Sequence, residues 1–216
     1  MITVEVSHSD LAYVQKKLKG ASDKAPMVIR NAANDTAVKA RKLLAEHAQE
    51  RYTVKSGGFN NHAKLHRATL SHLTAEIRVN GSPLSQPRYH TTAPKSGAKT
   101  EVLKGSGLKT LVNSAGNKAF KTKVATGNEN VQAGKRRKRK GAKATDLAKS
   151  KKTADMILQR TGSARYPLRS FHGPSVPKMI EKVYQGGKIT DAGLKEQIEQ
   201  IYQANIQKQI DQVMSG

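Results

Sequence analysis

The chain has 216 residues, of which 36% are hydrophobic and 4% aromatic, and its formal net charge at pH 7 is +23. A charge excess of this size points to polyanionic partners, meaning nucleic acid, an anionic membrane or an acidic protein surface, and the low aromatic content predicts a modest core. Cysteine is absent, which excludes disulfides, thiolate metal sites and cysteine nucleophiles. We expect no signal peptide and no membrane span, because no stretch approaches about 18 apolar residues.

The N-terminal part of the chain predicts a strand followed by two helices. Apolar and polar side chains alternate over residues 2–6, as in a half-buried strand. Apolar residues between 11 and 18 share one face of a short helix that we expect to end at Gly20. From Pro26 onward, small and apolar side chains recur every three or four residues, which predicts a long, closely packed helix. This stripe consists of Ile29, Ala33, Ala37, Ala40, Leu44, Ala48 and Tyr52.

The next segment predicts a loop, a short helix and a second strand. Residues 54–61 contain Gly57-Gly58 and are expected to form the loop. Residues 63–73 are consistent with a short helix. Residues 75–79 alternate between apolar and polar side chains, and the turn signal Asn80-Gly81 ends this strand.

Two later stretches lack an apolar period and are predicted to be extended arms. Residues 82–118 are rich in Ser, Thr, Gly, Lys and Pro. Residues 127–153 are predicted to be a disordered or extended basic loop that orders only on a partner. The strands expected in and around these arms cover residues 100–104, 108–112 and 119–125, with a return strand at Ile157 and Leu158.

The strongest single feature is a run of six consecutive cations within the second arm. Such a run can neutralise several phosphates, but neither a recognition-helix pattern nor stacking aromatics accompanies it, so sequence-specific reading is not expected. Contact with DNA, contact with an acidic protein and a solvated loop all fit the run, and a nuclear import signal has the same composition. The residues predicted to contact a polyanion or partner are Lys135, Arg136, Arg137, Lys138, Arg139, Lys140, Lys143, Lys149, Lys151 and Lys152.

The stretch after this arm predicts a strand, a tight turn and a helix start. Pro167 favours extended backbone before it, so residues 166–171 are expected to end a strand. Gly173-Pro174 is a turn signal, and Ser175 is a helix N-cap followed by a proline in the first turn. The residues assigned to this structural joint are Pro167, Leu168, Gly173, Pro174, Ser175, Val176 and Pro177.

Two amphipathic helices are predicted at the C-terminal end. The first covers residues 176–183 and stops at Gly186-Gly187, and the second docks on the domain or on a neighbouring subunit. The fold class is therefore α+β, in one domain over residues 1–216: a small antiparallel sheet packed by one long helix, C-terminal helices and a long basic arm. The residues assigned to subunit or partner packing are Leu194, Ile198, Ile201, Ile206 and Ile210.

Little in the sequence suggests catalysis. His62 and His66 have the four-residue spacing that would share one face of a possible helix, with His72 nearby, but no acidic residue completes a metal set, and a structural or surface role is favoured. Residues 104–110 only faintly resemble a phosphate-binding loop and lack its Gly-Lys-Ser/Thr ending, so a flexible loop is favoured. We expect no enzyme, no cofactor and no metal.

The segment Tyr166–Ile180, YPLRSFHGPSVPKMI, resembles the signature of the phage minor tail protein Z family, whose members carry a similar Gly-Pro-Ser-Val-Pro run. The likeness is best over residues 120–180, and the opening strand and helices, with the sequence IRNAANDTA, also resemble the start of that family. Residues 82–118 have no counterpart that we can place.

The resemblance implies a structural protein of the virion tail, acting in tail completion or at the head–tail junction (the neck), as a ring of identical subunits that we expect to be a hexamer. Its implied partners are other tail or neck proteins, such as a tail terminator, tail tube or connector, with packaged DNA as a non-specific contact. It would be assembled in the bacterial host cytoplasm, without a membrane. The alternative is a free, non-specific nucleic-acid-binding protein that uses the basic arm Lys135–Lys152.

Overall fold

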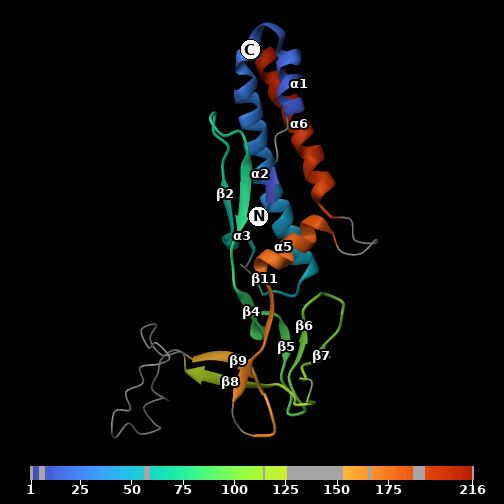
Figure 1. Ribbon diagram of the computed structural model, residues 1–216. Helices are drawn as coiled ribbons and strands as arrows, with labels where there is room; N and C mark the ends of the chain where they lie inside the picture. Colours follow the sequence, from blue (N-terminus) through green and yellow to red (C-terminus); the bar gives the residue numbers. More distant parts are fainter. Residues whose placement is uncertain are drawn as a thin grey trace, which may run out of the picture. The chain divides into compact units, whose positions relative to one another are not determined.

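The computed structural model describes residues 2–4, 8–55, 59–113, 115–125, 153–164, 167–186 and 193–215. Its mixture of helices and small antiparallel sheets is α+β, as predicted (Figure 1). The contacts divide the chain into two compact units. We call Met1–Pro83 with Pro174–Gly216 the helical unit, and Leu84–Gly173 the strand unit.

The helical unit begins as the sequence predicts. Strand β1 covers Ile2–Val4 and helix α1 covers His8–Leu18. The chain then forms a short 3-10 helix, η1 (Lys19–Lys24), so the first helical stretch does not end cleanly at Gly20. Helix α2 covers Ala25–Arg51 and has its proline in the first turn, where the missing N–H breaks no helical hydrogen bond.

The predicted small-residue stripe of α2 is the centre of the core. All seven of its members are buried, and the alanines allow close approach of α6 (Lys195–Met214), which runs beside α2 in Figure 1. A buried polar link fixes the register of the two helices, because the side-chain amide of Asn205 donates to the Thr36 hydroxyl at 2.8 Å. That hydroxyl donates in turn to the C=O of Ala32, so both buried groups are satisfied.

The sheet of the helical unit has the strand order β1-β3-β2 and packs on α2. Strand β3 (Ala75–Val79) matches the prediction, and its Ala75 and Ile77 are fully buried. The predicted helix over 63–73 is wrong, because a four-residue helix, α3 (Phe59–His62), leads directly into strand β2 (Ala63–His66). Ala63 and Leu65 alternate with two polar residues, which is the two-residue period of a strand. Four residues are too few to distinguish this period from a helical one, and pairing with β3 holds the segment as a strand.

The C-terminal helices follow the sequence pattern closely. Ser175 caps helix α5 (Val176–Gln185), its hydroxyl accepting from the Lys178 N–H at 3.5 Å, and a proline occupies the first turn. The apolar face of α5 is buried, and the helix ends at Gly186, whose φ of 81° suits glycine. The buried residues of this face are Val176, Met179, Ile180 and Val183.

The strand unit is built from short strands, and the described residues of 84–118 form strands and turns within it, not an extended arm. Two three-stranded antiparallel sheets have the orders β5-β6-β7 and β10-β9-β8, and a two-stranded sheet pairs β11 with β4 where the chain passes between units. The elements are β4 (Pro83–Ser85), η2 (Gln86–Arg88), β5 (His90–Thr92), β6 (Lys99–Glu101), β7 (Lys109–Thr110), β8 (Phe120–Ala125), β9 (Thr153–Arg160), β10 (Leu168–Ser170) and β11 (His172–Ser175).

The predicted turn at Gly173-Pro174 is also corrected, because both residues lie in β11. Gly173 is needed there for space. A Cβ at this position would lie 2.5 Å from the ring of Tyr89, which is fully buried. The glycine therefore allows the strand to pass directly over the largest buried side chain of the strand unit.

Candidate functional site

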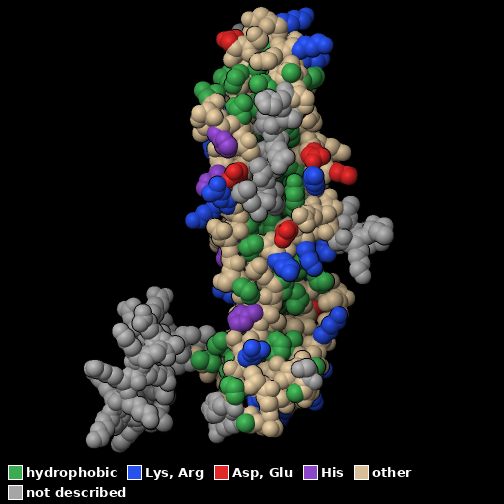
Figure 2. Space-filling model, in the orientation of Figure 1, with side chains coloured by type: hydrophobic (Ala, Val, Ile, Leu, Met, Phe, Trp, Pro, Cys, Tyr) green, Lys and Arg blue, Asp and Glu red, His purple; other side chains and the backbone are tan. Residues whose placement is uncertain are grey.

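The two units differ sharply in charge. The helical unit contains 18 Lys and Arg against 12 Asp and Glu, whereas the strand unit contains 21 against four. Among the described residues of the strand unit, ten Lys and Arg accompany only Glu101 and Asp155. Figure 2 shows Lys and Arg side chains at the surface around β5 to β7. The basic character of this unit therefore does not depend on the predicted basic arm alone.

The residues predicted to contact a polyanion, Lys135 to Lys152, lie outside the described residues. Their contact with a polyanion stays a prediction. The ten described cations of the strand unit are a separate set that the sequence interpretation did not single out. Their residue numbers are Arg88, Lys95, Lys99, Lys104, Lys109, Lys118, Lys121, Lys123, Arg160 and Arg169.

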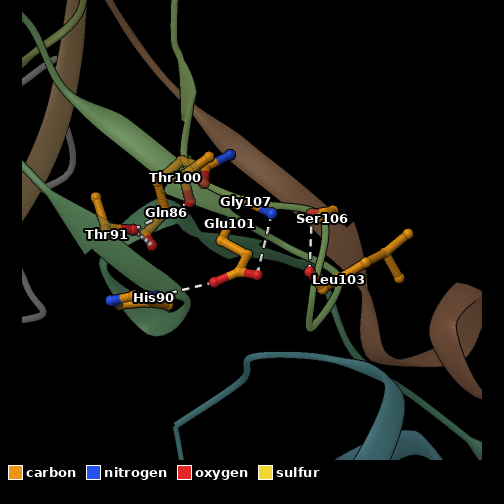
Figure 3. Close-up of polar contacts among 8 residues, drawn as sticks. All are labelled: Gln86, His90, Thr91, Thr100, Glu101, Leu103, Ser106 and Gly107. Carbon is orange, nitrogen blue, oxygen red and sulfur yellow. Dashed lines mark hydrogen bonds and ion pairs between the residues drawn. The ribbon is translucent and has the colours of Figure 1, made fainter.

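Glu101 lies at the centre of a polar network on β5 and β6 (Figure 3). Its carboxylate is 3.0 Å from Nδ1 of His90 on the paired strand and accepts from the Gly107 N–H at 3.2 Å. The hydrogen bond with His90, together with those from the backbone of Gly107 and Gly105, lowers the pKa of Glu101. The carboxylate is therefore held in its charged form by the chain itself.

This geometry explains the glycine-rich segment 104–110. Gly105 and Gly107 have φ values of 78° and 71°, which turn the backbone so that its N–H groups face a carboxylate. The segment is a turn between β6 and β7 that surrounds an anion, but the anion is Glu101 (Figure 3). Because Glu101 already accepts from these amides, the loop is not an open phosphate cradle.

The second acid of the strand unit is paired as well. Asp155 on β9 lies 2.8 Å from Nζ of Lys121 on β8. None of the other nine described Lys and Arg side chains of this unit forms an ion pair with a described residue. The unit thus combines internally paired acids with a large set of cations that an external anion can reach.

A buried polar cluster beneath this surface was missed by the sequence interpretation. Thr91 Oγ1 donates to the C=O of Gln86 at 2.7 Å and lies 3.1 Å from Oγ1 of Thr100 (Figure 3). Gln86 and Thr100 are buried, and Oε1 of Gln86 has no hydrogen-bond partner among the described residues. The only sequence signal for this inward-facing side chain is that Thr91 lies between two residues with exposed side chains. That signal was not recognised because the whole segment is rich in Ser and Thr.

The residues assigned to subunit or partner packing face the chain's own core. Leu194, Ile198, Ile206 and Ile210 are buried and Ile201 is half-buried, with α6 packed on α2 and α1. The sequence left open whether this helix docks on its own domain or on a neighbouring subunit, and in the structure it docks on its own domain. These side chains are therefore not exposed for a neighbouring subunit.

The histidines do not form the spacing that suggested a metal. His62 ends α3 and His66 ends β2, so they do not share a helix face, and Nδ1 of His62 lies 2.8 Å from the C=O of Asn80. Among the described residues no cluster of three or more His, Cys, Asp or Glu could hold a metal ion.

None of the described helices is long and apolar enough to cross a membrane. Comparison of the chain with protein-family models, with curated proteins and with solved structures found no match.

Proposed function

We propose that this chain is a structural component of a phage virion tail, a subunit that forms an oligomeric ring in tail completion or head–tail joining and lies close to the DNA path. The observation that carries the proposal is the segment Pro167–Pro177, whose sequence resembles the minor tail protein Z signature. This segment forms two short strands that lead into a capped helix. Its packing against Tyr89 and the Ser175 cap support the proposal that this segment has a structural role.

The small sheets of the chain support an assembly role. Each has two or three strands, so most strands lie at an edge, and in the described part of the chain these outer edges are not paired with a further strand. Free edges are templates on which neighbouring subunits add strands. The partners we propose are further copies of this chain, in a ring expected to be a hexamer, and other tail or neck proteins such as a tail terminator, tail tube or connector.

A non-specific nucleic-acid-binding protein is the second candidate. The observation that favours it is the excess of cations in the strand unit, because unpaired Lys and Arg release counterions when they contact phosphates. In the virion proposal the same charge would face packaged DNA or an acidic neighbour, in a particle assembled in the bacterial cytoplasm. The two candidates therefore differ in oligomeric state and in the strength of DNA binding by the free protein.

Light scattering after size exclusion, in moderate and in high salt, tests the proposal. A discrete multimer near six subunits that survives high salt is the expected result. A monomer in both conditions that binds DNA tightly and loses binding steeply with salt would instead establish the second candidate.

Deletion of residues 135–152 separates the candidates further. A ring subunit should still form multimers without this segment, because the described sheet edges remain. A nucleic-acid-binding protein that depends on the basic arm should lose its DNA affinity. The full-length chain, measured in the same buffers, is the control.

A further inference from the structure

The outer edge of β2 carries free backbone groups. The N–H of Asn80 donates to the C=O of His62 at 3.0 Å, which makes these two residues a hydrogen-bonded pair at the end of the β2–β3 ladder. Because such pairs alternate along antiparallel strands, the N–H and C=O of Ala63 and Leu65 point away from β3. No described strand pairs with β2 on that side. This edge is therefore a template for a further strand.

A basic groove lies beside this edge. It has a volume of about 670 Å³ and lies between the outer face of α2 and the segment from α3 to β2. Ala63 and Leu65 line it together with Arg41, Lys64 and Arg67, and no Asp or Glu does. Figure 2 shows Lys and Arg side chains at the surface over β2. We call this feature the β2 groove.

The β2 groove is long enough for a short strand. A second hollow of about 750 Å³ adjoins the β2 groove, shares Val38, Arg41, Asn60 and Asn61 with it, and continues along α2 to Gln49. Its lining includes Glu46, which is paired with Lys42. The edge of β2 itself has four residues, which at about 3.3 Å each span roughly 13 Å and match a short added strand. Val38 is 42% exposed and offers an apolar contact within this length.

The three cations of the β2 groove lack counter-charges. Lys39 and Lys42 on the same helix are engaged, with Asn205 at 2.9 Å and Glu46 at 3.8 Å respectively. Arg41, Lys64 and Arg67, by contrast, form no ion pair and no side-chain hydrogen bond with described residues. A partner that brings carboxylates into the groove would meet three unpaired charges.

We propose that the β2 groove binds an acidic, extended segment of a partner protein, which adds as a strand to β2 and places carboxylates against Arg41, Lys64 and Arg67. The backbone chemistry favours a peptide over nucleic acid. A peptide supplies both N–H donors and C=O acceptors to Ala63 and Leu65, whereas a phosphate backbone supplies only acceptors and would leave the two C=O groups unpaired. The inference does not depend on the virion assignment.

The test uses the full chain and a short fluorescent peptide in which Glu alternates with Thr and Val. Its affinity is measured by fluorescence anisotropy. The triple variant Arg41→Gln, Lys64→Gln, Arg67→Gln should bind at least about tenfold more weakly, because three charge contacts are removed. The matched control Lys16→Gln, Lys24→Gln, Lys182→Gln makes the same charge change elsewhere in the helical unit and should lose less than about twofold, through screened long-range attraction alone.

A second peptide separates strand addition from simple charge attraction. The same sequence, with N-methyl groups on alternate residues so that one edge lacks N–H donors, should bind as weakly as the groove variant binds the first peptide. Equal affinity of the two peptides, or equal losses in the two triple variants, would overturn the proposal. So would a short DNA duplex whose binding depends on the three groove residues while the peptide's does not. Lys64 and Arg67 are exposed, so the double variant Lys64→Gln, Arg67→Gln provides the same comparison if the triple variant misfolds.

Discussion

The helical unit and the strand unit bury very different amounts of apolar surface. Among the described residues, 28 buried hydrophobic residues belong to the helical unit, and four belong to the strand unit. Those four are Tyr89, Ala98, Ala119 and Ile157, the last three forming one small cluster with Leu111 and Phe171 at its border. Because the hydrophobic effect scales with buried apolar area, the helical unit has the larger source of stability.

The two units also differ in net charge, and this difference lowers the stability of the strand unit further. The strand unit has 17 more cations than acids over its 90 residues, and the helical unit has an excess of six over the remaining chain. Like-charge repulsion destabilises a compact state, and a small apolar core offsets little of it. The strand unit must therefore depend on well-placed polar contacts and close packing around Tyr89. Its stability should respond to anions more than that of the helical unit.

The largest expected effect comes from the core of the helical unit. Ile206 on α6 is 1% exposed, and replacing it with alanine leaves a cavity against α2. We expect Ile206→Ala to lower the free energy of unfolding of this unit by about 2–5 kcal/mol. Urea unfolding followed by far-ultraviolet circular dichroism measures it, because the long helices belong to this unit. Lys208→Ala, at an exposed position of α6, is the control and should shift the transition little.

Gly173 tests whether packing around Tyr89 holds the strand unit together. A Cβ at this position would lie within 2.8 Å of two ring carbons and the hydroxyl oxygen of Tyr89, so Gly173→Ala should destabilise the strand unit by about 1–3 kcal/mol. Hydrogen exchange in peptides from β5 and β9 measures the loss. Gly162→Ala is the matched control, since nothing lies within 4 Å of its added Cβ. Equal protection in the two variants would contradict the role of Tyr89 as the central packing contact.

The difference between the two units also explains which elements could be predicted from the sequence. The stripe of α2 and the apolar face of α6 repeat over many turns, so the helical period was clear without knowledge of the contacts. The Ser175 cap and the following proline act locally, and both were predicted correctly. Residues 63–66 were mistaken for a helix because four residues are too few to separate the periods.

The strand unit was less predictable because its order comes from contacts distant in the sequence. Thr91 and Thr100 face inward only through pairing between β5 and β6, and Gly173 belongs to a strand because Tyr89 lies beneath it. Residues 82–118 have no periodic apolar pattern from which these contacts could be predicted. The charge of this region was clear from composition, but the pairing of Glu101 with the glycine-rich turn required the hairpin geometry.

Loss of the helix cap at Ser175 should destabilise the protein less than the core substitutions do. Ser175→Ala removes the acceptor for the Lys178 N–H, and because this bond is long, at 3.5 Å, we expect a loss of about 0.5–1 kcal/mol. Faster hydrogen exchange in the first turn of α5 would report it. Ser175→Asn keeps a capping oxygen and should preserve the protection. Loss of multimers in Ser175→Ala, with stability unchanged, would mean that this joint contacts a neighbour directly.

The smallest effect is expected at Glu101 and depends on pH. Since the folded-state pKa of Glu101 is lowered, chiefly by the hydrogen bond with His90, its charged form stabilises the strand unit above the unfolded-state pKa. This contribution disappears as the pH falls through the lowered pKa, where the folded carboxylate is protonated too. Glu101→Gln should therefore weaken the β6–β7 turn at neutral pH and match the unsubstituted chain in strong acid. Protection of the Gly107 amide, compared between the two proteins across this range, tests the sign. A difference that persists unchanged in acid would mean that the shape of the side chain, and not its charge, orders the turn.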